Sequence, residues 1–280
     1  MIFDSYGKYI FYDGAMGTML QKRGLKPGER SDIMNITAPQ AVEEVHRLYV
    51  EAGSDIVCTN TFGANSDALS GTGYSPDDII FAAVAIAKRA CGGTAKVALD
   101  IGPTGQLLEP MGNLEYDKAY KLFYEQAIAG ARAGADFAAI ETMSDLAEIK
   151  AAILAVKENT SLPILATMTF DSTGRTYMGC LPEQFAETAE QLGAAAVGLN
   201  CSLEPSAMLE TAGRIAKATG LPLIVKPNAG LPDKATGGYS IDPEEFAAQM
   251  LPFADIGARI IGGCCGTSPD YIRELRKAFS

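Results

Sequence analysis

The chain has 280 residues, of which 48% are hydrophobic and 20% charged, so it can bury a large core and is not a disordered protein. Its 23 Lys and Arg are outnumbered by 34 Asp and Glu, giving a formal net charge of −11 that disfavours nucleic acid as a partner. The longest apolar run, residues 79–87, is far shorter than the roughly 20 residues of a membrane span. We therefore predict a cytoplasmic protein without membrane contact.

Short apolar runs alternate with longer amphipathic stretches along the whole chain. Strands are predicted, in chain order, over residues 9–12, 55–59, 96–101, 137–141, 164–170, 196–200, 223–226 and 259–262. Helices are predicted between them. The stretch 144–158 carries its apolar residues at steps of three and four, and the last helix is expected to begin at Pro269 with Ser268 as its cap.

Eight strand–helix pairs predict an α/β protein with a parallel sheet. The sheet could close into a barrel or open into a doubly wound fold. No G-x-G-x-x-G string follows the first strand, as a dinucleotide-binding fold would require, and no change of composition marks a second domain. We therefore predict a single (β/α)₈ TIM barrel over residues 1–280.

Such barrels carry their active sites at the carboxyl ends of the strands. Three of the connections that follow these ends are long for the fold, at residues 60–76, 171–181 and 228–240. Long loops on one face commonly carry function. We therefore expect the functional residues among the strand ends and these loops.

Three cysteines fall at two of the predicted strand ends. Cys201 ends the sixth strand, and Cys264 and Cys265 end the eighth, so all three should point into one mouth. Neighbouring residues of a regular strand face opposite ways, but glycines at 262, 263 and 266 allow the backbone to leave strand geometry. Three thiolates and one open position form a catalytic zinc site. Simple burial, redox chemistry and a phosphate-binding loop at residues 262–263 remain alternatives.

The other three cysteines, Cys58, Cys91 and Cys180, are expected to be small buried residues. A zinc site with three thiolates is too negative to generate hydroxide well, but it can bind a fourth, incoming thiolate. A free thiol is only a few per cent ionised at pH 7, and metal binding deprotonates it. Such a site suits a thiol substrate that attacks an electrophilic carbon, and methyl transfer is the simplest case.

Seven strings at the strand ends carry a resemblance. They are DGAMGT (13–18), TNTFGAN (59–65), DIGPTG (100–105), ETMSD (141–145), GLNCS (198–202), KPNAG (226–230) and GGCCGT (262–267). Together, in this order and over essentially the whole chain, they resemble the homocysteine S-methyltransferase family. Among its members the chain looks most like the homocysteine-binding barrel module of the cobalamin-dependent branch.

The resemblance implies functional roles at these positions. It implies one zinc ion on Cys201, Cys264 and Cys265, completed by the thiolate of homocysteine. It also implies that Asp13 and Glu141 hold the substrate's ammonium group. The backbone around Gly14 and Ala15 would receive its carboxylate, and Asn228 would serve as a provisional zinc ligand or a site-shaping amide. Taken alone, Asp13 and Glu141 fit helix-capping or packing roles equally well.

The resemblance further implies a methyl donor. We expect methylcobalamin or another methyl-corrinoid on a partner protein, because the chain ends just after its eighth helix. It also has no D-x-H-x-x-G string, and its only histidine, His46, lies in a helix pattern where we expect it partly buried.

Other functions remain open at this point. S-methylmethionine is one alternative donor. Betaine is another, disfavoured because the chain has no Trp, although Tyr74, Tyr177 and Tyr239 lie in the long loops. A different small thiol as acceptor, or a non-catalytic zinc-containing subunit that binds a partner, completes the alternatives.

Overall fold

Eight parallel strands surround a common axis in the part of the chain that the computed structural model describes, residues 2–26, 28–232 and 238–280. They are β1 (Ile10–Phe11), β2 (Ile56–Cys58), β3 (Lys96–Ile101), β4 (Phe137–Met143), β5 (Ile164–Met168), β6 (Ala196–Asn200), β7 (Leu223–Lys226) and β8 (Ala258–Ile261). The hydrogen-bonded order of the strands is β1-β8-β7-β6-β5-β4-β3-β2. A bridge between Tyr12 and Ile56 joins the two ends. The predicted (β/α)₈ TIM barrel is confirmed.

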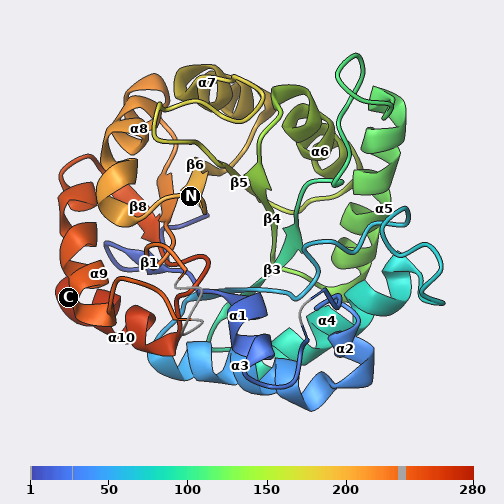
Figure 1. Cartoon of the computed structure of the whole chain (residues 1–280), viewed down its shortest axis with the longest axis horizontal. Coiled ribbons are helices and arrows are strands. Elements are labelled where there is room, and N and C mark those ends of the chain that lie inside the picture. The colour runs from blue at the N-terminus through green and yellow to red at the C-terminus, as the bar shows by residue number, and fades with distance from the viewer. Residues whose placement is uncertain (1, 27, 233–237) are drawn as a thin grey trace.

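Helices cover the outside of this barrel, as Figure 1 shows along its axis. They are α3 (Pro39–Ala52), α4 (Pro76–Cys91), α5 (Tyr116–Ala133), α6 (Leu146–Asn159), α7 (Pro182–Leu192), α8 (Pro205–Ala218), α9 (Pro243–Met250), the short 3₁₀ helix η1 (Leu251–Ala254) and α10 (Pro269–Ala278). Two short helices absent from the prediction, α1 (Met16–Gln21) and α2 (Met34–Thr37), precede α3. None of the helices in the described residues is long and apolar enough to cross a lipid bilayer.

Local sequence sets where the helices begin and end. Ser75 and Asp78 form a capping box at the start of α4, Pro76 takes the first helical position, and Gly92 ends the helix in the left-handed region. The start of α6 differs from the prediction. Asp145 stays extended and its carboxylate accepts a hydrogen bond from Ala147 N, so the helix begins at Leu146 instead of residue 144.

The strands bury both faces, as parallel barrel strands do. One set of side chains packs outward against the helices. The other fills the interior of the barrel, where the buried set comprises Ile10, Tyr12, Ile56, Cys58, Ala98, Ala139, Leu165, Ala196, Ile224 and Ile260 together with Phe3 and Phe137. The barrel centre is therefore packed. Cys91 and Cys180 are buried in the outer layer. Together with Cys58 in the barrel interior, all three cysteines that were predicted to be buried are buried.

His46, on α3, is completely buried instead of partly buried, and neither ring nitrogen has a hydrogen-bond partner among the described residues. Burial lowers its pKa from 6.5 to about 4. As the pH falls, His46 is therefore protonated at a higher pH in the unfolded chain than in the folded protein. Up to about 3 kcal/mol of the free energy of unfolding is lost between pH 6.5 and 4 as a result. We expect His46→Leu to remove this loss. The free energy of unfolding of the unmodified protein and of His46→Leu, measured across this pH range, tests the expectation. If the two proteins lose the same stability as the pH falls, burial of His46 is not the cause of the loss.

Candidate active site

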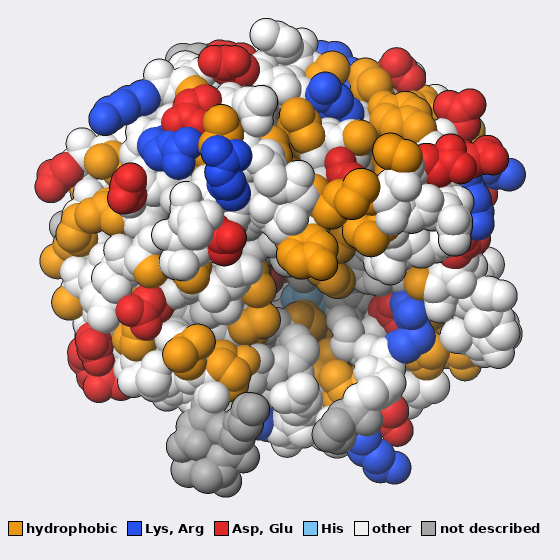
Figure 2. Space-filling model, turned by 45° about the horizontal axis from the view of Figure 1, so that its top comes forward, with side chains coloured by type: hydrophobic (Ala, Val, Ile, Leu, Met, Phe, Trp, Pro, Cys, Tyr) orange, Lys and Arg blue, Asp and Glu red, His pale blue; other side chains and the backbone are white. Residues whose placement is uncertain are grey.

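The carboxyl ends of the strands open into one cavity of about 280 Å³. Figure 2 shows a hollow on the surface of the molecule with apolar side chains at its border. The residues that line the cavity are Asp13, Gly14, Ala15, Met16, Gly17, Thr18, Ser31, Cys58, Thr59, Asn60, Phe62, Asp100, Glu141, Thr142, Cys201, Lys226, Gly263, Cys264 and Cys265. The structure thus brings every predicted site residue except Asn228 to the cavity wall, and Asn228 contacts Cys265, which is part of that wall.

The three cysteines converge at this mouth. Their sulfur atoms lie within 4.8 Å of one another, although Cys201 follows β6 and the other two follow β8. Cys201 adopts a left-handed conformation with a φ of 63°, which non-glycine residues rarely do. After β8, Gly263 allows a close approach because a Cβ atom there would lie 2.4 Å from Thr267 Oγ1, and Gly266, with a φ of 83°, completes the turn.

The geometry of the three thiols fits a zinc ion. Two sulfurs bound at ~2.3 Å to one tetrahedral zinc are separated by ~3.8 Å. The distance between Cys201 Sγ and Cys265 Sγ is 3.8 Å. Soft thiolate donors also favour zinc over magnesium or calcium. All three cysteines line the cavity, so a ligand that enters it can approach a metal ion held by them.

Without a metal, the three thiols share protons. Hydrogen bonds from Cys264 and Cys265 lower the pKa of Cys201 to about 3. The same contact with Cys201 raises the pKa of Cys264, and it raises that of Cys265 to about 11. The cluster therefore holds one thiolate and two thiols, and a metal ion that binds all three sulfurs displaces the remaining protons.

Two asparagines hold the thiols in place. Asn228 Oδ1 accepts a hydrogen bond from Cys265 N at 3.0 Å, and the same side chain contacts the Cys201 sulfur and lowers its pKa. The second is Asn200, which is fully buried. Its Nδ2 lies 3.8 Å from Cys264 Sγ and 2.7 Å from the hydroxyl of Thr142, so it ties the cluster to the end of β4.

Asp13 and Glu141 enter the cavity beside the thiols, together with a lysine. Lys226 Nζ is 2.6 Å from Glu141 Oε2 and 4.2 Å from the centroid of the Tyr12 ring. Burial disfavours the lysine's charge, but Glu141 and the other acidic groups outweigh this effect and raise its pKa. Lys226 therefore stays charged inside the barrel mouth.

Asp13 is also buried, and its Oδ2 accepts a hydrogen bond from Cys58 N at 2.7 Å. Burial raises its pKa to about 7, although Lys226 and the Cys58 amide partly oppose the shift. Asp100, at the end of β3, is a third carboxyl group in the same cavity. Burial and the nearby Glu141 raise its pKa as well. Among the described residues that line the cavity, the acidic groups therefore outnumber the one lysine.

The segment after β1 supplies the next part of the wall. Ala15 N donates to Thr267 Oγ1 at 3.2 Å, and Ala15 O accepts from the hydroxyl of Tyr49 at 3.0 Å. Gly14 is required here, because a Cβ atom would lie 2.4 Å from Thr267 Oγ1. The backbone at the two positions predicted to receive a carboxylate is thus held rigidly against α3 and the β8 turn.

The tyrosines considered as walls of a betaine site do not gather in this cavity. Phe62 is the one aromatic residue in its described lining. Tyr177 is 86% exposed, and Tyr74 packs against the core. Tyr239 lies against Gly266, where its ring would clash with a Cβ atom. It follows residues 233–237, the part of the predicted 228–240 loop that lies outside the described residues.

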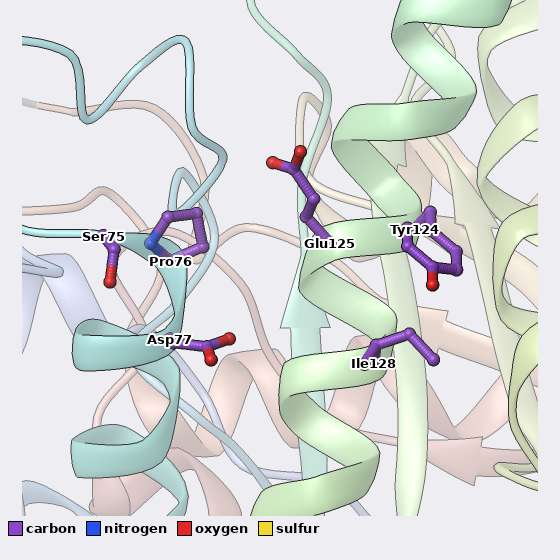
Figure 3. A pocket seen from close by; sticks show the side chains of 6 residues that line it. All are labelled: Ser75, Pro76, Asp77, Tyr124, Glu125 and Ile128. Atoms are coloured by element: carbon purple, nitrogen blue, oxygen red, sulfur yellow. The ribbon is translucent and has the colours of Figure 1, made fainter.

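A second hollow lies on the outside of the helix layer, between the start of α4 and the middle of α5 (Figure 3). It has carboxylates from Asp77 and Glu125 and apolar contributions from Pro76 and Ile128. Asp77 pairs with Arg132 across the surface at 3.3 Å. No group of metal ligands occurs there among the described residues, and the two groups found among them both line the cavity at the barrel mouth.

Sequence reasoning missed three residues of the site: Asp100, Asn200 and Lys226. All three stand in the strings that carry the resemblance, but no role was assigned to them. A lysine at the end of an apolar strand run is a usable signal, because a charged residue there points to a partner inside the barrel. The Asn200 and Asp100 contacts depend on packing between distant strands, for which the sequence offers no local sign.

Comparisons with known proteins place the chain in a family. A sequence model of the family described as homocysteine S-methyltransferase matches residues 10–279. The methionine synthases of Mycobacterium leprae and Mycobacterium tuberculosis are each 34% identical over 292 aligned positions, which cover 96% of this chain and 24% of each relative. The chain thus spans about a quarter of the length of these relatives.

Solved structures support the fold. The homocysteine methyltransferase MmuM from Escherichia coli superposes in its metallated form with a TM-score of 0.84 at 22% identity, covering 99% of this chain and all of that one. Its oxidised form gives the same TM-score at 24% identity, covering 98% of this chain and 97% of that one. With a sequence match over nearly its whole length and the same barrel, the chain belongs to the homocysteine S-methyltransferase family.

Proposed function

We propose that this barrel binds one zinc ion and homocysteine and transfers a methyl group to the substrate's sulfur, giving methionine. The observation that carries the proposal is the convergence of Cys201, Cys264 and Cys265 within 4.8 Å at the open end of the barrel. Zinc bound there would lower the pKa of the substrate thiol and so supply a nucleophile at neutral pH. Membership of the family and similarity to proteins named methionine synthase support the same activity.

The chain's own residues would position the substrate. Asp13 and Glu141 lie in the cavity beside the thiols, where they would hold the ammonium group, and the Gly14–Ala15 backbone would lie next to the carboxylate. Asn228 would keep Cys201 and Cys265 in place. In the reaction, the sulfur forms a bond to the methyl carbon while the bond between that carbon and the donor breaks. The electron pair of the broken carbon–donor bond stays on the donor, and the thiol proton of the substrate passes to solvent.

We propose a methyl-corrinoid as the donor, carried outside the described barrel, with S-methylmethionine and betaine as alternatives. The resemblance of the motif strings to the cobalamin-dependent branch supports the corrinoid. The scarcity of aromatic side chains in the described lining disfavours a cage for a quaternary ammonium group. All six cysteines are free in the structure, which supports a reducing, cytoplasmic setting.

The decisive experiment measures methionine formation from homocysteine by zinc-loaded protein with free methylcobalamin, with and without a zinc chelator. We expect turnover that the chelator abolishes and that added zinc restores. Turnover that persists without zinc would contradict the proposal. If the protein holds about one zinc per chain but uses only S-methylmethionine or betaine, homocysteine stays the proposed acceptor and the proposed methyl donor is wrong.

A further inference from the structure

The amide side chain of Asn200 is completely buried at the end of β6, and each of its hydrogen-bonding positions has a partner. Its Oδ1 accepts from Thr142 N at 2.8 Å and from Thr167 Oγ1 at 2.7 Å. Its Nδ2 donates to Thr142 Oγ1 at 2.7 Å and to Cys264 Sγ at 3.8 Å. Because a backbone N–H can only donate, the contact with Thr142 N fixes which end of the amide faces the sulfur. Asn200 therefore points an N–H group at Cys264.

This N–H group bears on a problem that the proposed reaction poses. Cys201, Cys264 and Cys265 all line the cavity, so a methyl donor that enters it can reach the protein's own sulfur atoms as well as that of the substrate. The thiolate is the nucleophilic form of cysteine, and zinc holds cysteine as the thiolate. Methylation of a zinc ligand would convert it into a neutral thioether and remove an anionic donor from the site. The protein therefore needs to make its own thiolates less reactive than the substrate's.

The two neighbouring cysteines after β8 differ in the groups that face their sulfur atoms. Cys264 Sγ faces the Asn200 N–H and is partly buried. Cys265 is exposed, and its sulfur lies 3.8 Å from that of Cys201, with no N–H donor among the described residues. A hydrogen bond to a thiolate is strong because the acceptor is charged, and it is largely lost when methylation removes the charge. It therefore slows methylation of Cys264, and Cys265 provides the matched sulfur without it.

We propose that Asn200 is a positioning residue whose N–H keeps Cys264 an unreactive zinc ligand, so that the methyl group passes to the substrate's sulfur instead. The inference rests on the proposed function, because it assumes that the three thiols hold zinc and that a methyl donor enters the cavity. In the side reaction that Asn200 suppresses, the Cys264 sulfur forms a bond to the methyl carbon while the bond between that carbon and the donor breaks. The electron pair of the broken bond leaves with the donor.

The test treats zinc-loaded protein with methyl iodide in the absence of homocysteine and measures S-methylation of each cysteine by peptide mass spectrometry. Asn200→Leu removes the N–H group and keeps a side chain of similar size. We expect methylation of Cys264, relative to that of Cys265 in the same protein, to be about 10-fold faster in this variant. Loosening of the whole cluster would speed both cysteines, so the ratio isolates the effect on Cys264. An unchanged ratio overturns the inference.

Thr167→Val is the matched control. Thr167 is buried and donates to the oxygen end of the same amide, so a valine of similar shape loosens Asn200 without removing its N–H. The methylation ratio should stay that of the unmodified protein. A ratio that rises as much as in Asn200→Leu overturns the inference. If Asn200→Leu does not fold, Asn200→Asp replaces it, because a carboxylate keeps both acceptor contacts and lacks the N–H.

Cobalt(II) in place of zinc gives a second readout without any methyl donor, the wavelength of the thiolate-to-cobalt absorption band. Loss of a hydrogen bond raises the energy of the sulfur electrons, so the band of Asn200→Leu should move to longer wavelength and that of Thr167→Val should not. A band that stays in place overturns the inference. If ratio and band change as expected but the unmodified protein forms no methionine from homocysteine with any of the three donors, the inference about Cys264 holds and the proposed function is wrong.

Discussion

Cys264→Ser is expected to lose most of its bound zinc and all methyl transfer to homocysteine, whereas Cys91→Ser should change neither. The sulfur of Cys264 lies within 4.8 Å of the other two and 3.8 Å from Asn200 Nδ2. A serine hydroxyl stays protonated near neutral pH and offers no soft anionic donor to zinc. Two thiolates then remain where three held the ion.

Cys91 serves as the control because it is a thiol of a different kind. It lies on α4 and is 2% exposed, and burial raises its pKa to about 11, so it stays protonated. A serine there can bond to the backbone carbonyl one turn earlier in the helix. Zinc per chain, measured by atomic absorption on protein whose thermal unfolding is recorded in parallel, separates the two variants. Loss of zinc from Cys91→Ser but not from Cys264→Ser would refute the site assignment.

The fold was predictable because apolar runs of the right length are bounded by charged or turn-forming residues. The three strands β3, β6 and β7 agree with the prediction at both ends. The other strands differ by one or two residues at one or both ends, where the chain leaves the ladder for reasons that depend on its neighbours. Strand β4 runs on to Met143, because a register shift after Ile140 and a left-handed Thr142 keep it paired with β5. Threonine is not favoured in that conformation, so no sequence pattern indicates it.

The short helices α1 and α2 escaped prediction for a related reason. They have six and four residues, too few for an apolar stripe to show its period, and they are held by packing. In the site, the strand-end rule brought the three cysteines and two carboxyl groups together from the sequence. It could not show that Cys201 turns back in the left-handed region, nor that Lys226 lies among the acidic groups. Both depend on contacts between strands that are far apart in the chain.

Lys226→Met is expected to lower the free energy of unfolding by about 3–5 kcal/mol, the cost of leaving a buried charge without its partner. Lys226 is 4% exposed, and its Nζ lies 2.6 Å from Glu141 Oε2. Its removal also leaves Asp13 and Asp100 without the one charge that lowers their pKa values. The double variant Lys226→Met/Glu141→Gln should recover part of the loss, because it removes the unpaired carboxylate.

The chain offers a matched ion pair that isolates the effect of burial. Lys88 Nζ lies at the same 2.6 Å from Asp136 Oδ2, but this lysine's side chain is 40% exposed. Water and salt screen such a pair, so Lys88→Met should cost no more than about 1 kcal/mol. Urea unfolding of the four proteins at pH 7 gives the comparison. If the two lysine variants lose the same stability, or if the double variant is no more stable than Lys226→Met, burial of the ion pair is not what makes Lys226 important. The lysine would then owe its place at the end of β7 to its contact with the Tyr12 ring.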